Sequence, residues 1–213
     1  LGDVYKRQAE ELRNVIKKQN QRTKKPARII TVTSGKGGVG KSNIAVNLAV
    51  QFQRMGLKTI IFDADIGLAN VEVMFGTIPQ YSLNDLIYHD KEIEDIITDG
   101  PEGVGFISGG SGIMGLSNLT LDQISYLVKS VEKLSVIADI VIVDTGAGIS
   151  DSVMEFVASS PEILLVTTPE PSSLTDAYSL LKMLYRNPKY DKNESVIHVP
   201  VSYTHLRAHE TRG

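Results

Sequence analysis

A glycine-rich stretch, TSGKGGVGKSNIAV at 33–46, holds the residues with the clearest chemistry in this chain. Glycine tolerates the positive φ angles that let successive backbone N–H groups converge on an anion, and a helix that starts there adds partial positive charge. Lys41 stands directly before Ser42, where its ammonium can reach the β- and γ-phosphates of a nucleotide while the hydroxyl binds Mg²⁺. Lys36 has no such local task, because a phosphate-binding loop needs one lysine. The predicted nucleotide-binding residues are Gly35, Lys36, Gly37, Gly38, Val39, Gly40, Lys41, Ser42 and Asn43.

Three aspartates stand at or just beyond the ends of two apolar, β-branched segments. Asp63 and Asp65 close the segment IIFDAD, and Asp144 closes IVIVD, ahead of Gly146 and Gly148. In an open parallel sheet, ligands bind beyond the carboxyl ends of the strands, and carboxylates there suit Mg²⁺ and a positioned water. An isolated aspartate at a strand end is often only a helix cap. Because these three accompany a phosphate-binding loop in one sheet, we favour the functional interpretation.

Apolar strands and helical patterns alternate from residue 28 onward. The predicted strands cover 28–34, 58–65, 104–110, 139–146, 162–169 and 195–199. The predicted helices cover 41–56, 82–90, 121–135, 149–160 and 173–186. This alternation predicts an α/β fold of three layers, a mostly parallel sheet with helices on both faces.

The bulk composition is that of an ordinary globular domain. The chain has 213 residues, 42% of them apolar, and a net charge of −3, which gives no sign of a nucleic-acid-binding protein. It contains no cysteine, so disulfides and thiolate metal sites are excluded within it. No apolar run approaches the ~20 residues that a spanning helix needs, and no signal-peptide pattern opens the chain.

The motifs KGGVGKS, DADIGLAN and DTGAG together resemble the deviant-Walker-A, or MinD/ParA, family of P-loop ATPases. That resemblance implies a three-layer P-loop fold, ATP and Mg²⁺ as cofactors, and an ATP-dependent homodimer. The early lysine, here Lys36, is then expected to reach the ATP of the partner subunit, where an added cation stabilises phosphoryl transfer.

The same resemblance assigns roles to the remaining polar residues. Lys41 and Asp65 join Lys36 as expected catalytic residues, with Asp65 orienting the attacking water. Mg²⁺ is expected on Ser42, Asp63 and Asp144, directly or through water. Gly146 and Gly148 are expected to give the second switch segment its mobility.

Two further stretches, FISGGSGI at 106–113 and VTTPEPSSLTDAY at 166–178, resemble more closely the FlhG (FleN/YlxH) group of this family, which controls flagellar number and placement. This implies an FlhF-type GTPase and flagellar basal-body components as partners. QAEELR at 8–13 resembles part of that group's activator motif, but the leading aspartate is missing. An adenine-reading asparagine and a membrane-binding helix would lie beyond Val199. We therefore expect a cytoplasmic protein that binds the inner face of the plasma membrane reversibly when full length.

The two ends of the chain are unlike the rest. LGDVYKRQ at 1–8 and VSYTHLRAHET at 201–211 match translations of the two strands of a common transposase sequencing adapter, although a polar tail is the alternative. We expect 1–8 and 200–213 to be non-native, 9–26 to be a helix and basic linker, and 27–199 to be a C-terminally truncated ATPase domain.

Alternative functions remain open at this point. A MinD-like role in division-site placement or a ParA-like role in segregation stays within the family, although segregation calls for a basic DNA-binding face. A metallocluster carrier would need cysteine ligands. A metabolic ATP-dependent ligase would need a substrate pocket beside the γ-phosphate.

Overall fold

The computed structural model describes residues 26–68, 70–110 and 119–202. Within these ranges the chain forms a seven-stranded sheet in the order β3-β4-β2-β5-β1-β6-β7. All neighbouring strands are parallel except the short edge pair β3–β4. The strands are β1 Arg28–Ser34, β2 Thr59–Ala64, β3 Thr98–Asp99, β4 Gly105–Ile107, β5 Ile140–Ala147, β6 Glu162–Leu165 and β7 Val196–His198.

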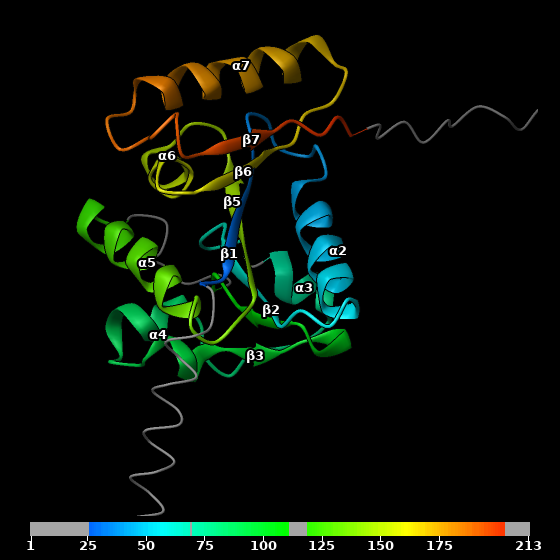
Figure 1. Ribbon diagram of the computed structural model, residues 1–213. Helices are drawn as coiled ribbons and strands as arrows, with labels where there is room; N and C mark the ends of the chain where they lie inside the picture. Colours follow the sequence, from blue (N-terminus) through cyan, green and yellow to red (C-terminus); the bar gives the residue numbers. More distant parts are fainter. Residues whose placement is uncertain (1–25, 69, 111–118, 203–213) are drawn as a thin grey trace, which may run out of the picture.

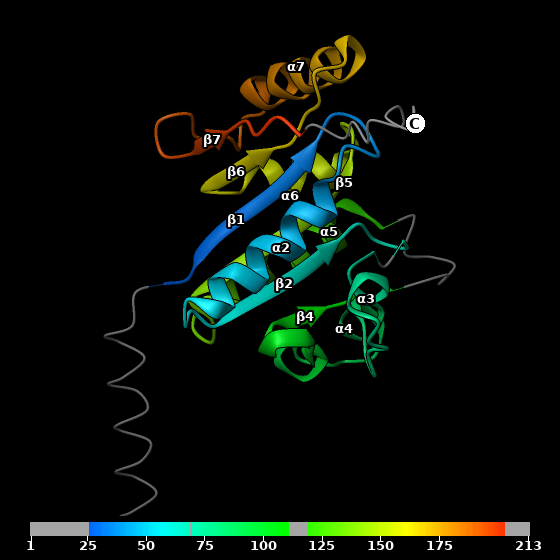
Figure 2. The same ribbon diagram turned by 90° about the vertical axis from the view of Figure 1, so that its right-hand side faces the viewer.

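Helices cover both faces of this sheet, with α2 on one face and α5 and α6 on the other (Figure 1, Figure 2). The predicted three-layer fold is therefore confirmed. The α-helices are α2 Lys41–Arg54, α3 Asn70–Phe75, α4 Leu83–Tyr88, α5 Leu121–Leu134, α6 Asp151–Ala158 and α7 Pro171–Arg186. Two 3₁₀ turns are η1 Ile93–Ile96 and η2 Pro101–Gly103. None of the helices in the described ranges is long and apolar enough to cross a bilayer.

The central strands are apolar on both sides because each side meets a helical layer. Along β5, Val141 and Val143 pack with the α5 residues Leu127 and Val131. Ile140 and Ile142 lie in the opposite cluster, with α2. Side chains alternate across a strand, so an unbroken β-branched run is the pattern of a strand buried on both faces. Each such buried side chain stabilises the fold by roughly 1.5–3 kcal/mol.

The structure differs from the predicted elements in a few places. Helix α3 was not predicted, because no local capping pattern marks its start. The Asp63 carboxylate, at the end of β2, accepts the N–H of Val71 and holds the first turn. The strand predicted at 162–169 ends at Leu165, and α7 begins two residues early, at Pro171. Proline suits the first helical position, since its missing N–H has no intrahelical partner there.

The predicted N-terminal helix at 9–21 and the segments 1–8 and 203–213 lie outside the described residues. Of the suspected non-native C-terminal segment, Pro200 accepts a hydrogen bond from the backbone N–H of Thr167 (3.1 Å), and Ser202 N–H donates to the Thr167 carbonyl (2.7 Å). These are bonds between backbone groups, which nearly every residue carries. They therefore do not depend on the side chains of this segment.

Gly35 offers a direct test of how the glycine-rich loop is packed. A methyl group at Gly35 would lie 2.3 Å from the backbone carbonyl carbon of Asp176 and 2.5 Å from the backbone nitrogen of Ala177, both in α7. Backbone atoms in a helix cannot move aside, so we expect Gly35→Ala to destabilise the protein by about 1–3 kcal/mol. That loss should lower Tm by about 2–4 °C per kcal/mol in a thermal melt without nucleotide.

Gly37→Ala is the matched control for this measurement. No atom lies within 4 Å of a methyl group built at Gly37, and its backbone is not in the left-handed region. We expect its melting temperature to stay within about 1–2 °C of the wild type. Equal melting temperatures for the two variants would show that α7 does not constrain the loop.

Candidate functional site

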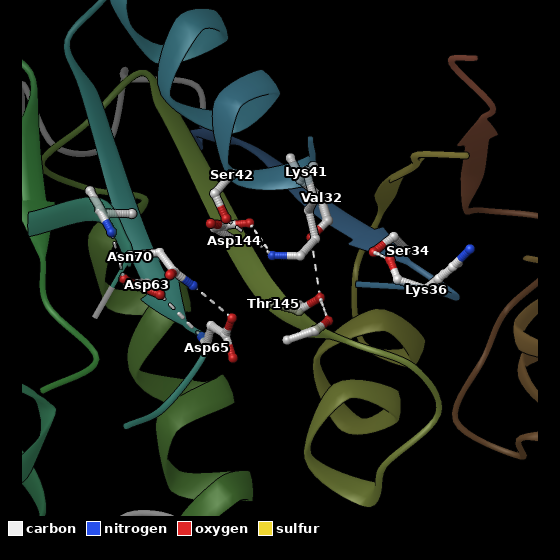
Figure 3. A network of polar contacts seen from close by, with 12 residues as sticks. Val32, Ser34, Lys36, Lys41, Ser42, Asp63, Asp65, Asn70, Asp144 and Thr145 are labelled. Atoms are coloured by element: carbon white, nitrogen blue, oxygen red, sulfur yellow. Dashed lines mark hydrogen bonds and ion pairs between the residues drawn. The ribbon is translucent and has the colours of Figure 1, made fainter. Parts of the chain in front are cut away.

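The carboxyl ends of the three central strands meet at one edge of the sheet. The pairing of β1 with β5 sets Val32 beside Asp144, and the pairing of β2 with β5 sets Asp63 beside the same residue. The glycine-rich loop follows β1, and the segment containing Asp65 follows β2. The parallel register therefore brings together the polar residues that lie far apart in the sequence (Figure 3).

Two glycines close the loop before α2. Gly38 (φ +77°) and Gly40 (φ +89°) occupy the left-handed region that other residues rarely adopt. Gly40 stands at the cap position of α2, where among the described residues no side chain caps the first N–H groups, and no acidic residue occupies the first turn. By contrast, the side chains of Ser82, Thr120 and Ser150 accept hydrogen bonds at the starts of α4, α5 and α6. The first N–H groups of α2 are thus available to an anion.

Lys41 and Asp144 form a buried ion pair below this loop. The Lys41 ammonium lies 2.8 Å from Asp144 Oδ1 and 3.4 Å from the hydroxyl of Ser42. The side chains of Lys41 and Asp144 are 8% and 0% exposed. Such a pair is costly to break unless both groups gain new partners. A nucleotide would supply one of these partners, because its phosphates attract the lysine.

Ser42 Oγ and Asp144 Oδ1, the two oxygens beside the Lys41 ammonium, fit the predicted Mg²⁺ site. One cation, the Lys41 ammonium, already contacts both Ser42 Oγ and Asp144 Oδ1. Asp144 Oδ2 is buried without a hydrogen-bond partner among the described residues, which leaves an oxygen available for a hydrated metal ion. Within the described ranges no three His, Cys, Asp or Glu side chains gather into a metal site. An ion held here would therefore take its other ligands from water and phosphate.

Asp63 has a structural task that the sequence interpretation did not assign. Its carboxylate accepts hydrogen bonds from the backbone N–H groups of Asp65 (3.1 Å) and Val71 (3.0 Å). It thereby caps α3 and fixes the turn that carries Asp65. Burial, together with the negative charge of Asp144, raises the pKa of Asp63 to about 7 against the lowering effect of the Val71 N–H. Its predicted support of Mg²⁺ stays a prediction.

Asp65 lies half-buried beyond β2 with its carboxylate held on one side. The amide of Asn70, the first residue of α3, donates to Asp65 Oδ2 at 2.8 Å. Burial raises the pKa of Asp65, and the Lys41 ammonium opposes that rise. A methyl group at Gly146 would lie 3.2 Å from Asp65 Oδ1, so glycine there leaves room for the carboxylate. Gly148 (φ +95°) donates its N–H to the Ser34 carbonyl at 2.8 Å.

Two adjoining clefts open above these residues. One, of about 500 Å³, is lined by the loop, by Ser42 and Asn43, and by Asn70 from α3. The other, of about 830 Å³, lies against Gly146 and the start of α6. Both clefts share Gly37, Gly38, Asp65 and Ala147. Their combined size is enough for a nucleotide, and Asp65 stands at the junction between them.

Lys36 contributes nothing to its own clefts. Its ammonium lies 2.9 Å from Glu170 Oε2 and 3.0 Å from Ser172 Oγ, at the start of α7. Figure 3 shows its side chain pointing away from Lys41 and Asp144. Gly35 and Val39 also lie away from the clefts, since Gly35 packs against α7 and Val39 is buried in the core with α2.

Sequence reasoning missed Asn70 as a residue of this site, and it missed Glu170 and Ser172 as the partners of Lys36. Asn70 lies within the motif DADIGLAN, five residues after Asp65. An amide side chain so close in sequence to a strand-end carboxylate was the signal that could have predicted a hydrogen bond between them. No local pattern links Lys36 to α7.

Comparison with known proteins gives consistent matches. The ParA family model, described as "NUBPL iron-transfer P-loop NTPase", matches residues 25–189. The antiactivator FleN of Pseudomonas aeruginosa is 43% identical over 162 residues, which are 76% of this chain and 58% of FleN. The flagellum site-determining protein YlxH of Helicobacter pylori is 37% identical over 185 residues, 84% of this chain and 63% of YlxH.

Among solved structures, the septum site-determining protein MinD of Pyrococcus horikoshii, complexed with Mg-ADP, superimposes with a TM-score of 0.67 at 28% identity. The match covers 80% of this chain and 68% of that one. The chain spans 58% and 63% of the lengths of FleN and YlxH.

Proposed function

Because this chain belongs to the ParA family of P-loop NTPases, we propose that the protein binds ATP with Mg²⁺, dimerises in the ATP-bound state and hydrolyses ATP slowly, as a switch that regulates flagellar number or placement. The observation that carries the proposal is the separation of the two lysines. Lys41 lies buried among the site residues of its own subunit, whereas Lys36 lies outside that site on an accessible surface.

The proposed mechanism uses the helix N-terminus, Lys41 and Asp65, which the structure already brings together. The first N–H groups of α2 bind the phosphates, and Lys41 moves its hydrogen bonds from Asp144 to the β- and γ-phosphates. Bound Mg²⁺, held by Ser42 and by Asp144 directly or through water, would neutralise phosphate charge. Asp65 orients the water that attacks the γ-phosphate. Positioning and charge stabilisation account for most catalysis of phosphoryl transfer, so a site with few moving parts suffices.

Dimerisation completes the proposed site. The Lys36 side chain is 40% exposed, and within the described part of the chain its ammonium is held by one ion pair and one hydrogen bond at the surface. Such exposed pairs contribute about 0–1 kcal/mol, so the ammonium can leave Glu170 at little cost when a partner subunit presents its ATP. The arrangement suits a lysine that acts in trans.

The cellular role rests on resemblance to the flagellar relatives. We propose an FlhF-type GTPase and basal-body components as partners, and reversible attachment of the full-length protein to the inner face of the plasma membrane. The family model's description mentions iron transfer, but the chain has no cysteine to supply thiolate ligands for iron. We expect no nucleic-acid partner for a chain with a net charge of −3.

Two alternative functions keep some support. The likeness to MinD favours a role in division-site placement with the same ATP chemistry. The cleft of about 830 Å³ beside Asp65 could hold the substrate of an ATP-dependent ligase. The ligase alternative predicts that ATP turnover depends on a small-molecule acceptor, whereas the switch predicts turnover with water alone.

Calorimetric titration of the full-length gene product with Mg·ATP tests the proposal. We expect binding by the wild type and a loss of roughly 10–100-fold in affinity for Lys41→Ala, because a charge-assisted hydrogen bond to phosphate is removed. Light scattering with a hydrolysis-resistant ATP analogue should show a doubling of mass for the wild type. A wild-type protein that neither binds Mg·ATP nor releases phosphate would rule out the proposed function.

The control for this titration is Lys58→Ala. Lys58 lies before β2 and lines neither cleft, and its backbone exchanges hydrogen bonds with Asp139. Lys58→Ala removes one positive charge, as Lys41→Ala does, but leaves the residues of both clefts unchanged. Equal losses for the two variants would mean that overall charge, rather than the position of Lys41, governs ATP binding.

A further inference from the structure

A single hydrogen bond sets the orientation of the Asp65 carboxylate. The Asn70 amide nitrogen donates to Asp65 Oδ2 at 2.8 Å. No other side-chain hydrogen bond to this carboxylate is made among the described residues. On the side of Oδ1 lies Gly146, where a methyl group would come within 3.2 Å of that oxygen, so the glycine leaves space there. Without Asn70 the carboxylate would be free to rotate about its own side-chain torsions.

Asn70 is itself fixed, because α3 is tied to the turn that carries Asp65. The Asp63 carboxylate accepts the N–H of Val71 with one oxygen and the N–H of Asp65 with the other. The first turn of α3 and the backbone of Asp65 are therefore anchored to the same buried side chain. This gives the Asn70 amide a defined place from which to hold Asp65.

The position of Asn70 also places it in the cleft that contains the phosphate-binding loop. Asn70 and Asp65 line this cleft together with Lys41 and Ser42. A carboxylate can orient an attacking water only if its own oxygens are held, and a displacement of about 1 Å can cost roughly 100-fold in rate. The second oxygen of Asp65, on the side of Gly146, is left for water.

We propose that Asn70 is a positioning residue for ATP hydrolysis, which holds the Asp65 carboxylate in the orientation that directs the attacking water. This inference rests on the proposed ATPase function and deepens it. Asn70 acts through Asp65 and not on ATP, so its loss should lower kcat and leave KM for ATP nearly unchanged. The loop and Lys41, which bind the phosphates, keep their contacts in its absence.

The test is steady-state phosphate release by the full-length gene product and its Asn70→Leu variant, which keeps the side-chain size and removes the amide. We expect kcat to fall about 10–100-fold and KM to change less than about threefold. Asn70→Gln, which keeps the amide on a longer side chain, should recover part of the lost kcat. Asn84→Leu makes the same replacement in the first turn of α4 and should turn over ATP at the wild-type rate.

Asn70→Asp covers the case in which Asn70→Leu fails to fold. Aspartate keeps the size and suits a helix start, but it removes the N–H donor and sets a like charge against Asp65. We expect a loss of kcat at least as large as for leucine, with a thermal melt close to the wild type.

The outcomes separate the inference from the proposed function. A wild-type protein without ATP turnover removes the function on which the inference rests. Wild-type turnover accompanied by an unchanged kcat in folded Asn70→Leu or Asn70→Asp overturns the role of Asn70. A raised KM at constant kcat also overturns it, because Asn70 would then be a binding residue.

Discussion

Replacing Asp65 with alanine is expected to leave ATP binding and ATP-dependent dimerisation intact while it lowers the rate of phosphate release by at least about 100-fold. Asp65 lies beyond the end of β2, at the junction of the two clefts. Among the described residues no hydrogen bond joins it to Lys41, Ser42 or Asp144, so its loss leaves the hydrogen bonds of Lys41 in place. A residue that orients water stabilises the transition state more than the bound ground state, so its loss affects kcat rather than affinity.

Three measurements on the full-length gene product check this expectation: phosphate release, calorimetric titration with ATP, and light scattering with a hydrolysis-resistant analogue. Asp122→Ala serves as the control. Asp122 is an exposed residue in the first turn of α5, so its substitution removes one negative charge away from the clefts. Release of phosphate at the wild-type rate by Asp65→Ala would refute the assignment. A loss of binding as large as that of Lys41→Ala would move Asp65 from hydrolysis to nucleotide binding.

The parts of this site that the sequence predicted are those encoded by local chemistry. Glycines at Gly38 and Gly40 do adopt the left-handed conformations that the loop needs, and α2 begins at Lys41 as expected. The strand ends were predictable because unbroken β-branched runs mark strands buried on both faces. Parallel pairing then places Asp63 and Asp144 side by side without further information.

What the sequence did not predict depends on contacts between distant segments. Lys36 pairs with Glu170, 134 residues later in the chain, and no local pattern couples the two. Helix α3 begins where the Asp63 carboxylate accepts the N–H of Val71, so its start depends on where β2 ends in space. Asp63 is a further case. Its support of Mg²⁺ stays a prediction, and the structure adds a task that the sequence did not assign to it, the capping of α3.

Lys36→Ala is expected to have the largest effect of all the substitutions. We expect the variant to fold, to bind ATP in its own subunit, and to remain monomeric with a hydrolysis-resistant analogue. Its phosphate release should fall roughly 1,000-fold, the low end of what a cation supplied in trans contributes to phosphoryl transfer. The reason is positional, because the Lys36 ammonium lies on α7 and outside its own clefts.

Glu170→Gln separates the loss of the ammonium from the loss of its ion pair. Both variants remove the ion pair between Lys36 and Glu170, but only Lys36→Ala removes the cation that a partner's ATP would meet. We expect Glu170→Gln to dimerise and to turn over ATP at close to the wild-type rate, since an exposed pair contributes about 0–1 kcal/mol. If Glu170→Gln lost dimerisation as fully as Lys36→Ala, the ion pair within the subunit would be the functional feature.

Mixing two inactive variants distinguishes action in trans from action within one subunit. A mixed dimer of Lys36→Ala and Asp65→Ala contains one site with Lys41 and Asp65 from one subunit and Lys36 from the other, so it is complete only if Lys36 acts in trans. Half of randomly formed dimers are mixed and each has one complete site, so we expect up to about a quarter of wild-type turnover to return. If Lys36 serves its own ATP, neither subunit of the mixed dimer has a complete site, and mixing restores nothing. Persistent inactivity of a mixture in which untagged Lys36→Ala copurifies with tagged Asp65→Ala, and mixed dimers are therefore present, would exclude the role in trans.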